Sequence, residues 1–570
     1  MNEEQIGFLL SNFEMKGLMK FGNLYHNNCF VHTDACTLKV RISANWRTFH
    51  QYADFLDNQP AKRRIKTDDF YFALDHDKGS ASLILQTDIV AYEPCFFFRK
   101  GCRFALSNNI ILLVDRLKRS GIDVDFDERK VREYLVFSES FFQDTIFKNI
   151  EKIPPAAIVK ITVASGEYEI HCYDDFRMKG DYTTAEEAAA HADRALDEYF
   201  KTHKSENLTF TIGMSGGLDS RVGAYYAVKN GYRIRPIFIG IERNRFGVFT
   251  NDAVCARRVN NELKCTNITF YNPKNMSIAE KLHNDALFAP GMVDNIPQNL
   301  GVIPKTDVLL HAMMGGEAFG QLVKTSLPNE SNEALAEYLI FCISCIPKSK
   351  ISVSLLRYCS MILPQNLKKI FSNDESLACE VLSEDDIQSL KERVMSWIEE
   401  QKEHGLDNIN IWHKWFYYRF APIARNGYYS TFNARVPSVA TYMNPCFIAE
   451  MLCWKSDFLL EKKVQKALLL RLGNLSKLRS QTTACTIAEE QSPLKKAVVA
   501  FNTLERFLRG GAMVYTDWYK PKEILDLLAQ YEKNSNLWPR IRFDVQRWIG
   551  SDFHMPLTLL KLLYLEEYLE

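Results

Sequence analysis

Short apolar runs bounded by glycine, aspartate and asparagine recur in the first third of the chain, a pattern typical of β-strands. They predict strands over residues 70–74, 82–87, 95–98, 103–107, 157–162 and 167–173. Between these runs, apolar positions recur with helical spacing over residues 109–120 and 127–137. The first part of the chain is therefore expected to be an α+β domain.

The pattern changes after residues 176–181, where a domain boundary is expected. Thr184 followed by Glu187 is a capping-box signature that opens an alanine-rich helix to about residue 201. Apolar runs over 208–214, 234–241, 267–271 and 307–311 then alternate with helical stretches, as parallel βαβ units do. Beyond about Glu330 the pattern is helical throughout, and the tail over 493–570 predicts a solvated, partly packed bundle.

Composition narrows the class of protein. A chain of 570 residues is too long for one hydrophobic core, so two or three domains are expected. Lysine plus arginine equals aspartate plus glutamate at 70 each, so the net charge gives no reason to expect a nucleic-acid partner. No apolar run reaches membrane-spanning length, and the first ten residues do not form a signal peptide. With fourteen scattered cysteines, these features predict a cytoplasmic protein with free thiols and no membrane partner.

One six-residue sequence contains the residue types expected of a phosphate-binding site. It follows a buried strand and opens a helix to about Asn230, and it consists of Ser215, Gly216, Gly217, Leu218, Asp219 and Ser220. Backbone N–H groups at a helix N-terminus bind anions, and adjacent glycines admit phosphate oxygens closely. The two serine hydroxyls add donors, whereas Asp219 suits Mg²⁺ that bridges phosphates. The alternative is an ordinary glycine turn that caps a helix, but the complete string in a βαβ context favours an ATP site.

SGGLDS is the pyrophosphate-loop signature of the ATP pyrophosphatase superfamily, and this form resembles that of the asparagine synthetases. Flanking segments over 235–240, 251–263, 432–437 and 466–471, and 86–98 and 149–156 before the loop, resemble the same family. The resemblance implies a mixed α/β protein with a glutaminase-like Ntn-type αββα sandwich over residues 1–178. It implies a doubly wound parallel PP-loop domain with an added helical region over 183–492, and a helical extension over 493–570. It also implies that ATP lies along Met214, Ile239 and Gly240.

The chain departs from the family at several positions. Its glutaminases use a cysteine at the mature N-terminus, whereas this chain begins Met1-Asn2 and its nearest cysteine is Cys29, so the first domain is expected to lack glutaminase activity. The family's metal-binding loop falls on residues 311–317. Gly315 and Gly316 would line ATP there, and Gly316 stands where the family has an aspartate. Glu317 would either bind Mg²⁺ or cap a helix.

Other positions are less specific. Asn433 replaces a glutamate of the family pattern. Lys477 or Arg479 is expected to supply positive charge for pyrophosphate release, with ordinary surface charge as the alternative. The Cys342 and Cys345 pair is interpreted as buried and structural, since no second metal-binding pair accompanies it. The histidines expected to be structural are His203, His311 and His413.

Together these features predict an AMP-forming carbon–nitrogen ligase that uses ATP and Mg²⁺. It would activate a small-molecule or peptide carboxylate as an acyl-adenylate and transfer the acyl group to ammonia or a substrate amine. A homodimer is compatible with this prediction. The main alternative is a nucleotide-binding scaffold or regulatory protein that has lost catalysis. A sulfur-transfer or tRNA-modifying pyrophosphatase shares the loop and would require Cys255 or Cys265.

Overall fold

Two six-stranded antiparallel sheets form the first part of the chain. The computed structural model describes residues 8–15, 18–27, 31–43, 70–137, 140–172, 182–202, 208–214, 217–239, 242, 251–271, 282, 308–312, 315–320, 327–341, 381–424, 438–452, 454–478, 521–543 and 554–570. In spatial order, the first sheet contains β10 (Ile150–Lys152), β8 (Phe96–Lys100), β9 (Arg103–Ser107), β1 (Leu9–Ser11), β3 (Leu24–His26) and β2 (Met19–Phe21). The second contains β12 (Tyr168–Cys172), β11 (Ala157–Thr162), β7 (Ser82–Thr87), β6 (Phe70–Asp77), β5 (Thr37–Ser43) and β4 (Val31–Thr33).

Alternating side chains explain how the two sheets pack. Phe97 of β8 lies in the apolar cluster between the sheets, whereas its neighbours Phe96 and Phe98 belong to the cluster on the opposite face. Phe8 and Phe72 stack across the inner core at 5.1 Å. Helices α2 (Ile110–Arg119) and α3 (Glu128–Phe137) contribute to the cluster on the outer face of the first sheet. Within the described residues the layers are thus helix, sheet and sheet, and the predicted fourth layer is not among them.

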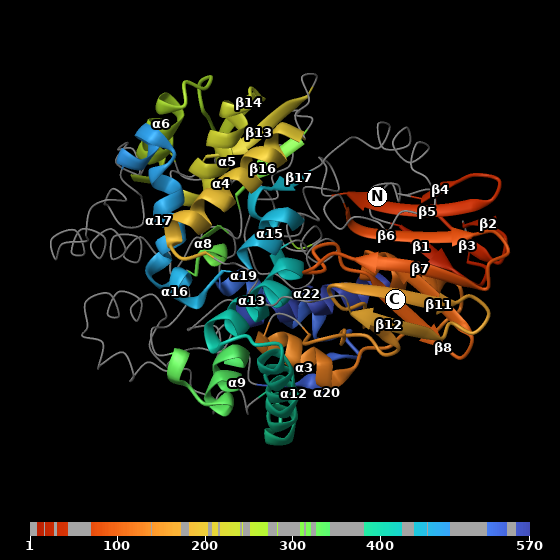
Figure 1. Ribbon diagram of the computed structural model, residues 1–570. Helices are drawn as coiled ribbons and strands as arrows, with labels where there is room; N and C mark the ends of the chain where they lie inside the picture. The colour runs from red at the N-terminus through yellow and green to blue at the C-terminus, as the bar shows by residue number, and fades with distance from the viewer. Residues whose placement is uncertain are drawn as a thin grey trace.

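A five-stranded parallel sheet forms the second part, as predicted, and lies apart from the antiparallel strands in Figure 1. Its spatial order is β15 (Thr269–Tyr271), β14 (Arg233–Ile239), β13 (Thr209–Gly213), β16 (Val308–His311) and β17 (Ser438–Ala440). The chain runs outward from β13 to β15 and then returns to the other side of β13. The order therefore reverses between β13 and β16, which makes this gap the topological switch point.

Helices connect and surround these strands. The helices next to the parallel strands are α4 (Ala185–Thr202), α5 (Leu218–Lys229), α6 (Asn251–Glu262) and the short α8 (Gly315–Ala318). The later elements used below are α9 (Asn332–Phe341), α12 (Glu384–Glu403), α13 (Asn408–Ala424), η5 (Thr441–Met443), α15 (Pro445–Met451), α16 (Ser456–Leu459), α17 (Lys463–Leu470) and η7 (Gly473–Lys477). The expectation of helix alone beyond Glu330 is wrong at β17, because a three-residue strand shows no periodicity and its pairing partner β16 is distant in sequence.

The last helices return to the first domain. These are α19 (Pro521–Tyr531), α20 (Trp538–Ile541) and α22 (His554–Leu569), and α22 contacts both α2 and α3. Arg540 donates to the Asp125 carboxylate at 3.1 Å and to Glu128 at 2.7 Å. Within the tail, which was predicted to be a solvated, partly packed bundle, α22 is a packed element with five leucines that are almost completely buried: Leu559, Leu560, Leu562, Leu563 and Leu565.

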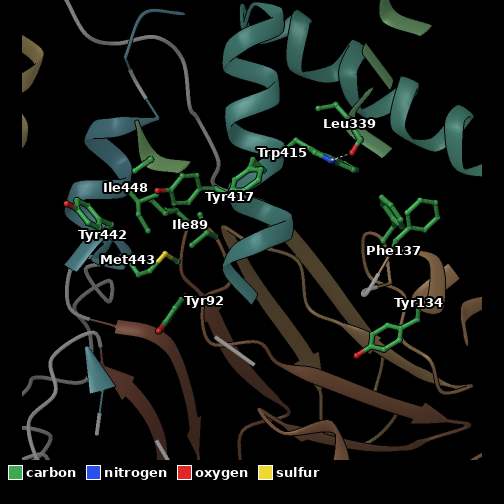
Figure 2. Close-up of a cluster of buried hydrophobic side chains, with 14 of the residues drawn as sticks. Ile89, Tyr92, Tyr134, Phe137, Leu339, Trp415, Tyr417, Tyr442, Met443 and Ile448 are labelled. Atoms are coloured by element: carbon green, nitrogen blue, oxygen red, sulfur yellow. Dashed lines mark hydrogen bonds between the residues drawn. The ribbon is translucent and has the colours of Figure 1, made fainter. Parts of the chain in front are cut away.

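The two sheet systems meet through a buried cluster shown in Figure 2. Ile89 and Tyr92 come from the segment between β7 and β8, and they join Tyr417 of α13 and Met443 of η5. Arg419 of α13 crosses the same junction and donates to the carbonyls of Phe137, Leu339 and Ile340 at 3.2–3.3 Å. Among the described helices, none is both long and apolar enough to cross a membrane.

Candidate functional site

The switch point of the parallel sheet brings two predicted segments together. The segment after β13 begins helix α5, and the segment after β16 begins α8. Parallel strands present their carboxyl ends at one edge, and ligands of open α/β sheets bind there, at the reversal of strand order. Gly217 is the N-cap of α5, with an extended backbone at φ −71° and ψ 168°. The preceding Ser215 and Gly216 lie outside the described residues.

Asp219 lies in the first turn of α5 and is held by two buried side chains. The Nε2 of Gln465, on α17, donates to Oδ1 of Asp219 at 2.8 Å. The hydroxyl of Tyr442, in η5, donates to the main-chain oxygen of Asp219 at 3.2 Å. Gln465 is 2% exposed and Tyr442 is fully buried, so both donors are fixed by packing. The carboxylate and the backbone of Asp219 are thus fixed by different elements.

The Tyr442 hydroxyl is a protonated donor, and its surroundings favour that form further. Burial first, and then the negative charge of Asp219, raises the pKa of Tyr442 well above its ordinary value. The neutral phenol therefore remains a hydrogen-bond donor at physiological pH. Its ring also packs on Phe319 and Phe447, at 5.8 and 5.5 Å between centroids, which fixes the side chain from the other side.

Gly315 packs directly against Asp219. A Cβ at this position would lie 2.6 Å from both Cβ and Cγ of Asp219 and 2.5 Å from Cε2 of Tyr442. Such distances are shorter than any real carbon contact, so only glycine fits without moving Asp219. The predicted ATP-lining residue Gly315 and the predicted metal ligand Asp219 are thereby neighbours. Gly316 and Glu317 belong to α8, but the surroundings of Gly316 and the side chain of Glu317 are not described.

The other predicted loop residues bond locally. The Ser220 hydroxyl donates to the Gly217 carbonyl at 3.3 Å, and the Met214 amide donates to the Ile237 carbonyl at 2.8 Å, which extends the sheet. Leu218 begins the helix and is partly buried. Ile239 ends β14, whereas Gly240 lies outside the described residues.

Arg221 is a residue whose contribution the sequence did not predict. It is fully buried, and its Nη1 donates to the carbonyls of Leu475 and Leu478 at 3.2 and 2.8 Å. Burial lowers the pKa of this guanidinium. These bonds attach the start of α5 to η7, the segment that carries Lys477. Lys477 itself is exposed and donates to Asn474 at 3.2 Å, and Arg479 lies outside the described residues. The available sequence signal was an arginine immediately after the loop string.

The remaining candidates take structural positions or lie outside the described residues. His413 is buried, and its Nε2 lies 3.0 Å from the carbonyl of Ala318 at the end of α8. His311 ends β16, and its side chain is not described; His203, Cys342, Cys345 and Asn433 also lie outside the described residues.

Two cysteines bear on the sulfur-transfer alternative. Cys255 is buried on α6, and burial raises the pKa of Cys265. A raised pKa disfavours the thiolate that a sulfur-transfer nucleophile needs.

Mg²⁺ with ATP fits the residues of this site. Within the described ranges, no three His, Cys, Asp or Glu side chains gather as a metal site. Mg²⁺ does not need such a cluster, because it commonly binds through one or two carboxylates together with substrate phosphates and water. Asp219 supplies one carboxylate at the start of a twelve-residue helix, where phosphate anions are favoured.

Comparisons with known proteins give no family. No protein-family model matches the chain, and no curated protein matches it. Among solved structures, the chain is similar to the glutamine phosphoribosylpyrophosphate amidotransferase of B. subtilis, complexed with ADP and GMP. The identity is 8% and the TM-score is 0.18, over 49% of this chain and 86% of that chain.

Proposed function

We propose that this chain is an ATP- and Mg²⁺-dependent ligase similar to the asparagine synthetases. It would activate a small-molecule or peptide carboxylate as an acyl-adenylate and pass the acyl group to ammonia or a substrate amine. The observation that carries the proposal is the position of Asp219: at a helix N-terminus, at the switch point of a parallel sheet, and fixed by Gln465, Tyr442 and Gly315. The division into domains over 1–178, 183–492 and 493–570 is part of the same proposal.

The proposed roles follow from charge and position. The N-terminus of α5 would bind the phosphates, and Asp219 would hold Mg²⁺. When bound, Mg²⁺ neutralises phosphate charge and orients the triphosphate. Arg221 would act indirectly, because it holds η7, the segment that carries Lys477. Glu317, in the neighbouring α8, is proposed as a second carboxylate for the metal.

Binding and exchange experiments test this proposal. Asp219→Asn keeps an oxygen that can accept from Gln465 but removes the charge, so Mg²⁺-dependent ATP binding should fall at least tenfold. The matched control is Asp386→Asn, because Asp386 also lies in the first turn of a helix, α12. Calorimetric titration with ATP, with and without Mg²⁺, measures the effect. Wild-type protein without MgATP affinity, or an Asp219→Asn variant that binds MgATP normally, contradicts the proposal.

Pyrophosphate exchange separates the ligase from the scaffold. A ligase should incorporate labelled pyrophosphate into ATP when a suitable carboxylate is present, and Asp219→Asn should abolish this exchange. MgATP binding without exchange, across a panel of amino acids, peptides and sugar acids, would favour the nucleotide-binding scaffold instead. A front domain that resembles a glutaminase and the raised pKa of the partly buried Cys265 both disfavour sulfur transfer.

A further inference from the structure

Gln465 is a buried glutamine that donates to the proposed metal ligand. It lies on α17, distant in sequence from the loop, and its amide is directed at the carboxylate of Asp219 at 2.8 Å. The residue before α17, Lys462, has a left-handed backbone at φ 56°, which begins the helix with an abrupt turn. Val464, Leu468 and Leu469 of α17 are buried, so the helix that carries Gln465 is fixed by its apolar face.

Three elements therefore converge on one partly buried residue. Gln465 of α17 orients the carboxylate, Tyr442 of η5 holds the carbonyl, and Gly315 of α8 allows the close approach. Residues around metal ligands typically orient them by hydrogen bonds of this kind, because an oriented ligand loses less freedom when the metal binds. An aspartate that only capped a helix would not need contacts from three other elements.

The chemistry of the amide is also informative. Glutamine supplies an N–H donor without charge, so it orients the carboxylate without placing a second charge beside it. A lysine or arginine at the same distance would neutralise that charge, whereas a glutamate would repel it or share a metal with it. Tyr442 is likewise a neutral donor.

We propose that Gln465 is the positioning residue for Asp219 and that it sets the Mg²⁺ affinity of the nucleotide site. This inference rests on the proposed function, in which Asp219 holds the metal. It assigns Gln465 no contact with substrate; its effect is to hold the carboxylate in one orientation before Mg²⁺ arrives.

The first test is Gln465→Met, which keeps the length of the side chain but removes the donor. The Mg²⁺ concentration for half-maximal ATP binding should rise about 10- to 100-fold, the range for loss of a contact that orients a ligand. ATP binding at saturating Mg²⁺ should change much less. Gln401→Met is the matched control, because Gln401 of α12 is also buried and also makes a side-chain hydrogen bond. It accepts from Lys414 of α13 at 2.5 Å. It should leave the Mg²⁺ dependence unchanged.

The second test, Gln465→Glu, has a readout that general destabilisation does not produce. It places a second carboxylate beside Asp219, and two adjacent carboxylates form a site for a divalent cation. Nucleotide-free Gln465→Glu protein should therefore bind Mn²⁺, by electron paramagnetic resonance, at least tenfold more tightly than wild type. The added Asp219→Asn substitution should abolish that gain.

The outcomes separate this inference from the proposed function. Wild-type protein without MgATP affinity overturns the proposed function and the inference with it. Wild-type protein that binds MgATP, combined with a Gln465→Met variant whose Mg²⁺ dependence equals that of wild type, overturns the inference alone. So does a Gln465→Glu variant without added Mn²⁺ affinity, since the two carboxylates would then not be neighbours.

Discussion

The contact of Gly315 with Asp219 gives the most direct prediction, the effect of Gly315→Ala. The added Cβ would lie 2.5–2.6 Å from atoms of Tyr442 and Asp219, whereas carbon atoms pack at about 3.5 Å or more. The groups must therefore separate by about 1 Å. Tyr442 is fully buried, and the atoms of Asp219 that would be struck are Cβ and Cγ, close to the backbone, so neither group can turn aside easily.

Two opposing effects set the magnitude. Alanine is about 1 kcal/mol better than glycine within a helix interior, and Gly315 is the first residue of α8, so the variant gains at most that amount. Overpacking of a rigid site costs about 1–3 kcal/mol, which outweighs that gain in most of its range. The same displacement of about 1 Å should lower pyrophosphate exchange about a hundredfold, because catalytic groups tolerate such shifts poorly. MgATP affinity should fall at least tenfold, because the carboxylate of Asp219, the proposed Mg²⁺ ligand, would itself be displaced.

The assay combines unfolding in denaturant with MgATP titration of the folded protein. Gly213→Ala is the matched control, because Gly213 ends β13 beside the same loop, and a Cβ there would meet no atom within 4 Å. The control should bind MgATP as wild type does. If Gly315→Ala behaves like Gly213→Ala in both measurements, the close packing of Gly315 on Asp219 is refuted.

Two further predictions concern the first domain and its junction. Burial raises the pKa of Asp88 to about 7, whereas an unfolded aspartate has a pKa of about 3.9. The contribution of Asp88 to the stability of the folded protein is therefore fully present below about pH 4 and is lost as pH rises through about 7. Ionisation of Asp88 should therefore lower the free energy of unfolding by about 2–3 kcal/mol between pH 5 and pH 8. Denaturant titrations at both pH values should show a smaller pH-dependent difference for Asp88→Asn than for wild type. An equal difference in the two proteins would contradict the assignment. Arg419→Met should cost about 3 kcal/mol or more, because the carbonyls of Phe137, Leu339 and Ile340 lose a buried donor. Faster proteolysis in the native state would report it, and an unchanged cleavage rate would argue against the role of Arg419.

Local signals predicted much of the secondary structure. The capping-box signature is confirmed: the Glu187 amide donates to the Thr184 hydroxyl at 3.2 Å, and α4 begins at Ala185. The reciprocal bond differs from the standard pattern, because Glu187 accepts from the Thr183 amide at 2.7 Å. The helix predicted over 109–120 is likewise confirmed as α2, with Asn109 as its N-cap. Each of these features depends on residues within one helical turn.

Strands near the N-terminus were missed, for different reasons. β1, β2, β3 and β4 have three residues each, too few for alternation to be recognised. β5 carries a usable signal, because Leu38 and Val40 are buried on alternate positions.

Only part of the candidate site could be predicted from the sequence. The string over 215–220 indicated Asp219, because strand, glycine turn and helix are consecutive in sequence. Gln465 and Tyr442 could not be inferred from pattern, since they reach Asp219 only after α17 and η5 pack beside α5. Arg221 follows the string directly, but its contacts could not be inferred from sequence, because its carbonyl partners Leu475 and Leu478 reach it only in the tertiary structure.

The return of α22 to the first domain has a consequence for biosynthesis. Helices α2 and α3 leave the ribosome about 400 residues before α22, a delay of roughly 20–80 s at ordinary rates of translation. During that time the apolar surface that α22 later covers is exposed to solvent and to other nascent chains. Chaperone capture of ribosome-bound intermediates, followed by release once the leucine-rich helix emerges, is the expected course of folding in the cell.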